Sequence, residues 1–119
     1  MTIDLREAPI PLDFSQGTKF FKALSDETRV RILHILSCGE LCGCSLLEYF
    51  SISQSTLSHH LSLLMEVGLV SGRRTGKWMH YSINRLAADQ LIGILERILL
   101  PNQECECQKI WDKCPAKEC

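Results

Sequence analysis

Two cysteines separated by a single residue, Cys42 and Cys44, carry the most specific chemistry in the chain. A thiolate is a ligand for soft metal ions and also a nucleophile. In a regular helix, residues i and i+2 point to nearly opposite sides, so two thiolates at this spacing cannot hold one ion. The pair therefore predicts an ion site only where the backbone departs from a regular helix.

The residues that follow indicate such a departure. Ser45 to Glu48, SLLE, fits the capping box, in which the N-cap hydroxyl and a carboxylate three residues later satisfy each other's backbone donors. We therefore expect a short helix from about Ser45 to Phe50, with both cysteines in the turn before it or in a first turn that can unwind. Their sulfur atoms can then converge. In the alternative interpretation, both cysteines are small buried apolar side chains.

Seven cysteines in 119 residues are an odd number, and four of them fall in the last 19 residues. The N-terminus is too charged for a signal peptide, and Gly93, Glu96 and Arg97 interrupt the most apolar later segment. We therefore expect a cytoplasmic protein without a membrane segment. A reducing compartment argues against a disulfide framework and favours metal or redox chemistry.

The length and composition predict one compact domain, which self-association would stabilise further. We expect a flexible N-terminal arm at residues 1–13, a domain at 14–100 and a Cys-rich tail at 101–119. Apolar periodicity predicts helices over about Phe14–Leu24, Asp26–Ser37 and Leu86–Leu100. In the second of these helices, we expect the apolar residues Val30, Ile32, Leu33 and Leu36 to face a core.

A further helix is predicted from an N-cap at Ser53 to a stop at Gly68, with an apolar stripe at helical spacing. Its first two turns carry small or planar hydrogen-bonding groups without a carboxylate, which is the chemistry needed to read a major groove. The alternative is an ordinary solvated face. Together with the short helix before it, this helix has helix-turn-helix organisation. The candidate contact residues are Gln54, Ser55, Thr56, Ser58 and His59.

Two extended runs, Leu69–Arg73 and Trp78–Ile83, flank a turn and predict a β-hairpin with a basic tip. The net charge of the chain is −1, but residues 51–85 carry four basic side chains and one acidic side chain, which gives +3. This local excess coincides with the candidate contact helix and the hairpin. Arg73, Arg74 and Lys77 are therefore candidate contacts to DNA phosphates.

Residues 20–83 closely resemble the ArsR/SmtB family of winged helix-turn-helix, metal-sensing repressors, notably its arsenic-responsive members. The matching segments are FKALSDETRVRILHIL (21–36), ELCGC (40–44), SQSTLSHHLSLLMEVGLV (53–70) and GKWMHYSI (76–83). The resemblance implies a mainly α fold with a small β-hairpin. It also implies a homodimer, joined mainly through its first and last helices, that binds double-stranded operator DNA and releases it when a metal or metalloid binds.

Cys42 and Cys44 match the family's sensing position. Trivalent arsenic or antimony, As(III) or Sb(III), suits two or three thiolates, whereas zinc usually takes four ligands. In the resemblance, arsenic-responsive members with three such cysteines place the third where this chain has Leu47. Cys38 and the tail residues Cys105 and Cys107 are therefore candidate third ligands, with preference for the tail. The alternative for the tail is adventitious ion binding; Cys114 and Cys119 remain unassigned.

We expect no organic cofactor, and three other functions compete with the metalloid sensor. The same fold could sense zinc, cadmium or lead, or it could sense thiol oxidation. A thiol enzyme is disfavoured, because the chain lacks a C-x-x-C motif and a phosphate-cradle loop after a cysteine. His60 faces Leu57, Leu61 and Leu64 of the contact helix, so we expect it to be a satisfied core histidine rather than a DNA contact.

Overall fold

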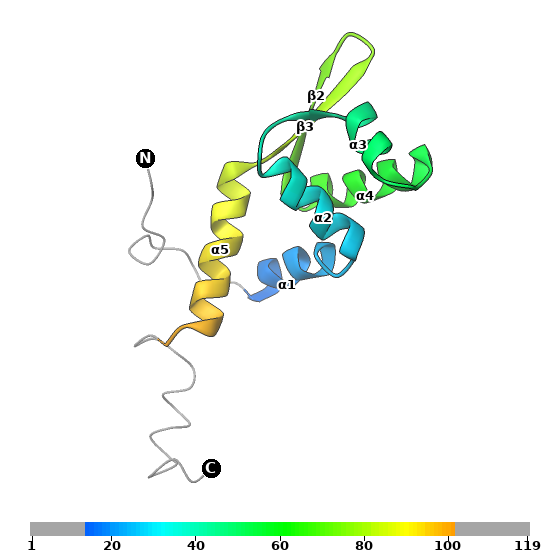
Figure 1. Cartoon of the computed structure of the whole chain (residues 1–119). Helices are drawn as coiled ribbons and strands as arrows, with labels where there is room; N and C mark the ends of the chain where they lie inside the picture. Colours follow the sequence, from blue (N-terminus) through cyan, green and yellow to red (C-terminus); the bar gives the residue numbers. More distant parts are fainter. Residues whose placement is uncertain (1–13, 102–119) are drawn as a thin grey trace, which may run out of the picture.

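The computed structural model describes residues 14–101, which form five helices and three strands (Figure 1). Residues 1–13 and 102–119, which include the expected arm and all but the first residue of the expected tail, lie outside the described residues. The elements in chain order are α1 (Phe14–Ala23), α2 (Glu27–Leu36), β1 (Leu41–Cys42), α3 (Gly43–Tyr49), α4 (Gln54–Glu66), β2 (Val70–Thr75), β3 (Trp78–Ile83) and α5 (Arg85–Leu99).

Side-chain caps set the starts of the longer helices. The Asp26 carboxylate accepts hydrogen bonds from the backbone N–H groups of Thr28 and Arg29, at 2.8 and 3.3 Å, and so caps α2. Ser53 caps α4, as predicted, by accepting from the backbone N–H of Thr56 at 3.1 Å. Asn84 caps α5 in the same way. The helices α2, α4 and α5 therefore begin within one residue of their expected starts.

The expected start of α3 at Ser45 is wrong. The helix begins at Gly43, and its N-cap is Cys42, with an extended backbone at φ −69° and ψ 144°. Cys42 pairs with His80 of β3, so sheet pairing fixes the point at which the chain turns into the helix. The capping-box residues Ser45 and Glu48 consequently lie within the helix.

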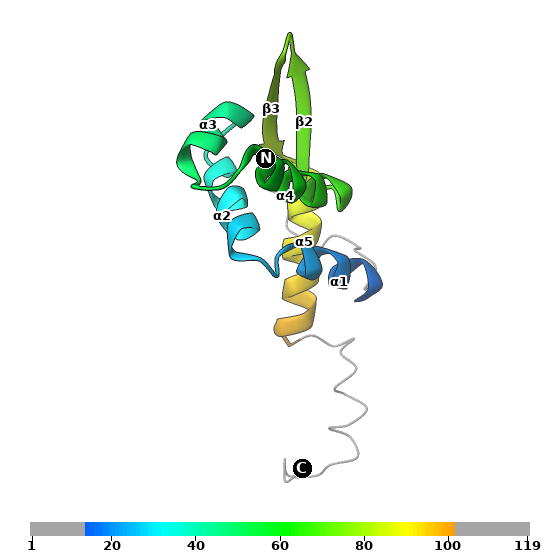
Figure 2. The same cartoon turned by 90° about the vertical axis from the view of Figure 1, so that its right-hand side faces the viewer.

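The sheet has three antiparallel strands in the order β1-β3-β2, rather than a hairpin alone. The two residues of β1 are too few to show an alternating pattern in the sequence. Between β2 and β3, Gly76 adopts φ +62°, a left-handed conformation that suits glycine in a tight turn. Figures 1 and 2 show the hairpin projecting from the helical body at the end opposite α5.

The core lies between the helices and the base of the sheet. Its most deeply buried side chains are Phe20, Ile32, Leu46, Leu61, Leu64 and Leu69. These residues come from α1 to α4 and from the turn before β2, so the core holds α3 and α4 against α2. Val30 was expected to face this core, but it is 45% exposed. Within residues 14–101, no helix combines the length and the apolar character needed to cross a membrane.

Candidate thiol site and nucleic-acid interface

Cys42 and Cys44 converge at the junction between β1 and α3. Their Sγ atoms are 2.7 Å apart, and both thiols are free. Convergence at i, i+2 spacing occurs because Cys42 has the extended conformation of a strand end, while Cys44 lies in the first turn of the helix. Cys44 is exposed and Cys42 is partly exposed, so the two are not simply buried apolar side chains.

The contact between the two thiols shifts their pKa values in opposite directions. The hydrogen bond from the Cys44 thiol lowers the pKa of Cys42, and the backbone N–H groups of Cys44 and Ser45 lower it further. The same thiol–thiol contact raises the pKa of Cys44. Of the two thiols, Cys42 is therefore the one that ionises more readily. The groups that lower the pKa of Cys42 are a thiol and backbone amides. A search of the sequence for a nearby Lys or His could therefore not have predicted this shift.

Gly43 allows the backbone to turn between the two thiols against an aromatic ring. A Cβ atom at this position would lie 3.2 Å from Cε2 of Tyr81 in β3. That separation is tighter than ordinary van der Waals contact, so any larger residue would displace the ring or the turn. The ring of Tyr81 therefore serves as a wall behind the thiol pair.

Among the described residues, no third ligand lies close to Cys42 and Cys44. Cys38 follows α2 and lines a separate hollow with Glu40 and Arg85. Within residues 14–101, no three Cys, His, Asp or Glu side chains are grouped closely enough to hold a metal ion. The other candidates, Cys105 and Cys107, lie outside the described residues, as do Cys114 and Cys119. The position at which the family resemblance implies a third cysteine carries Leu47, which lines a hollow with Cys42 and Cys44.

The first two turns of α4 present their polar side chains to solvent. All five candidate contact residues of this helix, Gln54, Ser55, Thr56, Ser58 and His59, are exposed. The hydroxyl of Ser53 donates to Thr56 Oγ1 at 2.8 Å and lies 3.1 Å from Ser55 Oγ. These contacts restrict the side-chain conformations at the start of the helix.

His60 lies on the other side of α4 and is only partly exposed. Its Nδ1 lies 3.1 Å from Nη1 of Arg29 in α2, and Arg29 Nε also donates to the carbonyl oxygen of Ala23 at 2.6 Å. A guanidinium only donates, so Nδ1 of His60 accepts this hydrogen bond. His60 therefore connects α4 to α2 as a satisfied histidine, as predicted, but it lies at the edge of the core and not within it.

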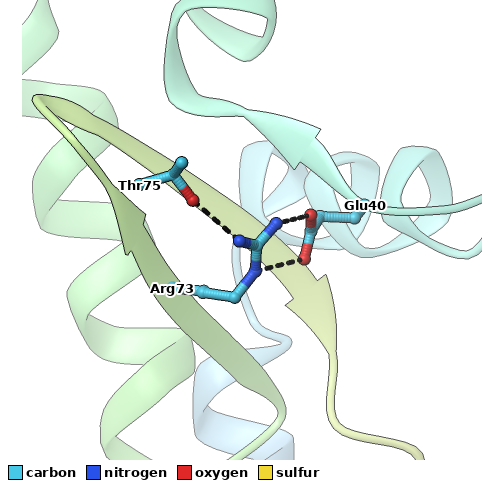
Figure 3. Close-up of polar contacts among 3 residues, drawn as sticks. All are labelled: Glu40, Arg73 and Thr75. Atoms are coloured by element: carbon cyan, nitrogen blue, oxygen red, sulfur yellow. Dashed lines mark hydrogen bonds and ion pairs between the residues drawn. The ribbon is translucent and has the colours of Figure 1, made fainter.

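The three basic residues of the hairpin are not equivalent. Arg74 and Lys77 are exposed, and the Lys77 ammonium lies 5.5 Å from the ring centroid of Trp78. Arg73, in contrast, forms an ion pair with Glu40: Nη2 donates to Oε1 at 2.6 Å and Nε donates to Oε2 at 3.5 Å (Figure 3). Its Nη1 also donates to Thr75 Oγ1 at 2.7 Å. Its charge is therefore already paired within the protein.

The Arg73 hydrogen bond lowers the pKa of the Glu40 carboxyl. Glu40 in turn raises the pKa of Arg73. Sequence reasoning missed this pair, because its members are 33 residues apart and nothing local connects them. It also missed Arg31 of α2, whose guanidinium lies 5.7 and 5.5 Å from the ring centroids of Tyr49 and Phe50. That contact holds the end of α3 to α2.

The thiol site and the hairpin share one sheet. Cys42 pairs with His80, and His80 pairs with Arg73 on its other side, so the three residues form one row across β1, β3 and β2. Backbone hydrogen bonds along this row resist relative displacement of the strands. Cys42 is therefore connected to the hairpin through this row as well as to α3 through the chain.

An α-helical body, an exposed polar helix and a basic hairpin define the winged helix-turn-helix architecture of DNA-binding proteins. The family model described as "Bacterial regulatory protein, arsR family" matches residues 26–71. The arsenical resistance operon repressor of Staphylococcus aureus is 41% identical over 99 residues, which cover 83% of this chain and 95% of that protein. The chain belongs to the ArsR family and is a DNA-binding transcriptional repressor.

Two further comparisons agree with this assignment. A cadmium resistance transcriptional regulatory protein CadC homolog of Staphylococcus aureus is 43% identical over 83 residues, covering 69% of this chain and 66% of that protein. A crystal structure described as a possible transcriptional regulator for arsenical resistance has a TM-score of 0.62 and 29% identity. That comparison covers 67% of this chain and 83% of the solved one.

Proposed function

We propose that this repressor releases its operator when trivalent arsenic or antimony binds through Cys42 and Cys44. The convergence of the two sulfur atoms, 2.7 Å apart, is the observation that carries the proposal. A soft ion with a preference for thiolates suits this donor set. The arsenical resistance repressor that is 41% identical to this chain supports the same signal.

Capture requires no redox chemistry. Arsenous acid, As(OH)₃, exchanges hydroxyl groups for thiolates, and each exchange forms one As–S bond and releases one water molecule that carries the thiol proton. Cys42, whose pKa is lowered, attacks first, and Cys44 closes the chelate. A third thiolate for inorganic arsenic would come from Cys105 or Cys107 of the proposed tail, 101–119. The separate position of Cys38 makes it the weaker candidate.

In the proposed complex with DNA, the exposed face of α4 enters the major groove. Its candidate contacts to base edges or phosphates are Gln54, Ser55, Thr56, Ser58 and His59. Arg74 and Lys77 contact the phosphate backbone from the hairpin. Arg73 contributes only after it exchanges the Glu40 carboxylate for a phosphate, because both compete for the same guanidinium.

We further propose a homodimer formed through α1 and α5. The described parts of these helices expose large apolar side chains, with Phe14 at 46%, Ile98 at 42% and Leu99 at 72% exposure. Apposition of two such surfaces would place two copies of α4 at successive major grooves, about 34 Å apart. The proposed domain is residues 14–100. The proposed site of action is the cytoplasm, where thiols stay reduced.

Ion capture and DNA binding are linked through the junction that holds the thiols. A bound ion changes the end of β1 and the first turn of α3, and the sheet row from Cys42 to Arg73 passes this change to the hairpin. Release follows if the changed geometry cannot place α4 and the hairpin on DNA together. The coupling is reciprocal, so DNA weakens ion binding by the same factor.

A thiol redox sensor on the same fold is the second candidate, because two adjacent thiols, one with a lowered pKa, are also what oxidation requires. Sensing of zinc, cadmium or lead is a third, and the cadmium-related relative favours its inclusion in the test.

The test is a fluorescence-anisotropy titration of the reduced protein on its own upstream promoter DNA. Arsenite, antimonite, zinc, cadmium, lead and hydrogen peroxide are added in parallel. Release by arsenite or antimonite alone supports the proposal. Release by peroxide alone, or by zinc, cadmium or lead alone, would show that the repressor responds to that signal and not to arsenic or antimony.

A further inference from the structure

A hollow of about 690 Å³ lies between α1, the start of α2 and the C-terminal end of α4; we call it the basic hollow. Three cationic side chains line it, Lys19 and Lys22 of α1 and Arg29 of α2, together with one carboxylate, that of Glu66. The apolar residues of its lining are Ala23, Leu63 and Val67. Its volume lies in the range of pockets that hold small organic ligands, about 300 to 1,000 Å³.

The basic hollow lies apart from the candidate DNA contacts and from the face of α1 that packs on α5. In both views α1 lies on the side of α4 away from the hairpin (Figures 1 and 2). A Cβ atom at Gly17 of α1 would lie 3.1 Å from Cγ2 of Ile94 in α5. Lys19, two residues later, points to nearly the opposite side of the helix. The positive charge of the hollow is therefore separate from the surfaces proposed for DNA and for the dimer.

The cations of the basic hollow retain capacity for an anion. Within residues 14–101, neither Lys19 nor Lys22 forms an ion pair. Arg29 donates from Nε to the carbonyl oxygen of Ala23 at 2.6 Å and from Nη1 to Nδ1 of His60 at 3.1 Å, and both acceptors are neutral. A carboxylate would therefore gain charge-assisted hydrogen bonds at this site. An apolar group attached to it would remove the apolar lining from water.

We propose that the basic hollow binds a small organic monocarboxylate with an apolar body, and that this ligand weakens operator binding. The carboxylate contacts the ammonium groups of Lys19 and Lys22 and the guanidinium of Arg29, while the apolar body packs on Leu63 and Val67. The proposal adds a second effector site to the repressor. It requires neither the thiol pair nor a metalloid.

Arg29 connects the basic hollow to the contact helix. Its Nη1 is bonded to His60, which directly follows the candidate DNA contact His59 in α4. A carboxylate forms stronger hydrogen bonds with a guanidinium than a neutral imidazole does, so the ligand draws Arg29 away from His60. The helix α4 then loses a contact that fixes its position on α2, and operator binding weakens. The coupling is reciprocal, so DNA weakens binding of the carboxylate by the same factor.

Binding is tested first without DNA, by isothermal titration calorimetry of the reduced full-length protein with 4-phenylbutyrate at low salt. The expected dissociation constant is about 0.1 to 1 mM for a ligand of this size. 4-Phenylbutyramide has the same body without the charge and should bind at least roughly tenfold more weakly. Acetate has the charge without the body and should also bind at least roughly tenfold more weakly.

Two charge variants locate the site. Lys19→Gln together with Lys22→Gln should weaken 4-phenylbutyrate binding roughly tenfold or more, because both ammonium groups are removed from the hollow. Lys77→Gln together with Arg85→Gln removes two charges elsewhere and should bind the carboxylate like the wild type. Both pairs lie on the surface, so circular dichroism should show the same fold.

The link to DNA is measured by fluorescence anisotropy on the promoter DNA. Saturating 4-phenylbutyrate should raise the operator dissociation constant of the wild type roughly three- to tenfold. The same concentration should leave that of the Lys19→Gln/Lys22→Gln variant unchanged.

Equal binding of the carboxylate and the amide, or undiminished binding by the Lys19→Gln/Lys22→Gln variant, would overturn the anion site. Binding that leaves the operator affinity of the wild type unchanged would overturn the proposed effect on DNA. Release by arsenite is measured on the same complex and should persist in the Lys19→Gln/Lys22→Gln variant, because Cys42 and Cys44 are intact. A failure of the carboxylate proposal therefore leaves the metalloid proposal standing.

Discussion

Arg73 of the hairpin is bound to Glu40, the residue directly before the strand that carries Cys42, with Nη2 and Oε1 2.6 Å apart. A residue expected to contact DNA is thus held by a carboxylate next to the proposed ion site. Both side chains remain accessible, at 60% and 38% exposure, so the pair can exchange partners with phosphate and solvent.

Glu40→Gln should strengthen operator binding, because it removes the charge that competes with phosphate for Arg73. The expected gain is roughly two- to fivefold, since an exposed ion pair of this kind is weak. The slope of log K against log salt should steepen by about 0.9, as one more phosphate contact forms. Fluorescence anisotropy at several salt concentrations measures both quantities.

Glu48→Gln is the matched control for this prediction. Glu48 is an exposed carboxylate on α3, so its removal changes the net charge equally without releasing Arg73. An equal gain in both variants would mean that net charge, and not the Glu40–Arg73 pair, sets the affinity.

Cys42→Ser together with Cys44→Ser should abolish release by arsenite while operator affinity stays within roughly a factor of two, because both residues lie on the surface. Cys38→Ser is the control and should respond like the wild type, since Cys38 lines a different hollow. The readout is an arsenite titration of the DNA complex. Induction that survives in the double variant would contradict the assignment of the thiol site.

The opposite pKa shifts of Cys42 and Cys44 predict opposite changes in the reactivity of each thiol when the other is removed. Cys44→Ala removes the thiol donor and should raise the pKa of Cys42, so alkylation of Cys42 by iodoacetamide becomes slower near neutral pH. Cys42→Ala should lower the pKa of Cys44, so Cys44 reacts faster at the same pH. Site-resolved mass spectrometry over a pH series measures both rates. If the alkylation rates of Cys42 and Cys44 changed in the same direction in the two variants, the two thiols would not share a proton.

Leu99→Asp should weaken the proposed dimer, because it places a charge on an apolar surface that is 72% exposed in the single chain. Operator binding should weaken with it, since a monomer reaches only one half-site. Analytical ultracentrifugation and anisotropy measure the two effects. Val30→Asp, also at an exposed apolar residue but on α2, should leave the oligomeric state unchanged. A Leu99→Asp protein that stays dimeric would exclude this part of α5 from the interface.

Local signals in the sequence predicted most of the helices and the hairpin. Ser53 as an N-cap, the acidic start of α2 and the periodic apolar residues of α4 all act within a few residues, so they can be read without the fold. The exposed contact face of α4 follows from the same periodicity. The spacing of Cys42 and Cys44 also identified them as a pair that converges only outside a regular helix.

The start of α3 required the tertiary structure. Ser45 and Glu48 have the local pattern of a capping box, yet pairing of Cys42 with His80 of β3 moves the helix start to Gly43. The two-residue strand β1 is defined by its pairing with β3, which is distant in the sequence. Local propensity is a weak preference that such a contact overrides.

The sequence by itself thus determined the helix-turn-helix order, the exposed polar face of α4 and the identity of the thiol pair, because each depends on spacing along one element. Only the tertiary structure decided that Arg73 is paired with Glu40 and that Leu47, Trp78 and Tyr81 share a hollow with the thiols. These relationships join residues far apart in the chain. Their geometry depends on how α3, α4 and the sheet pack together, which no local pattern encodes.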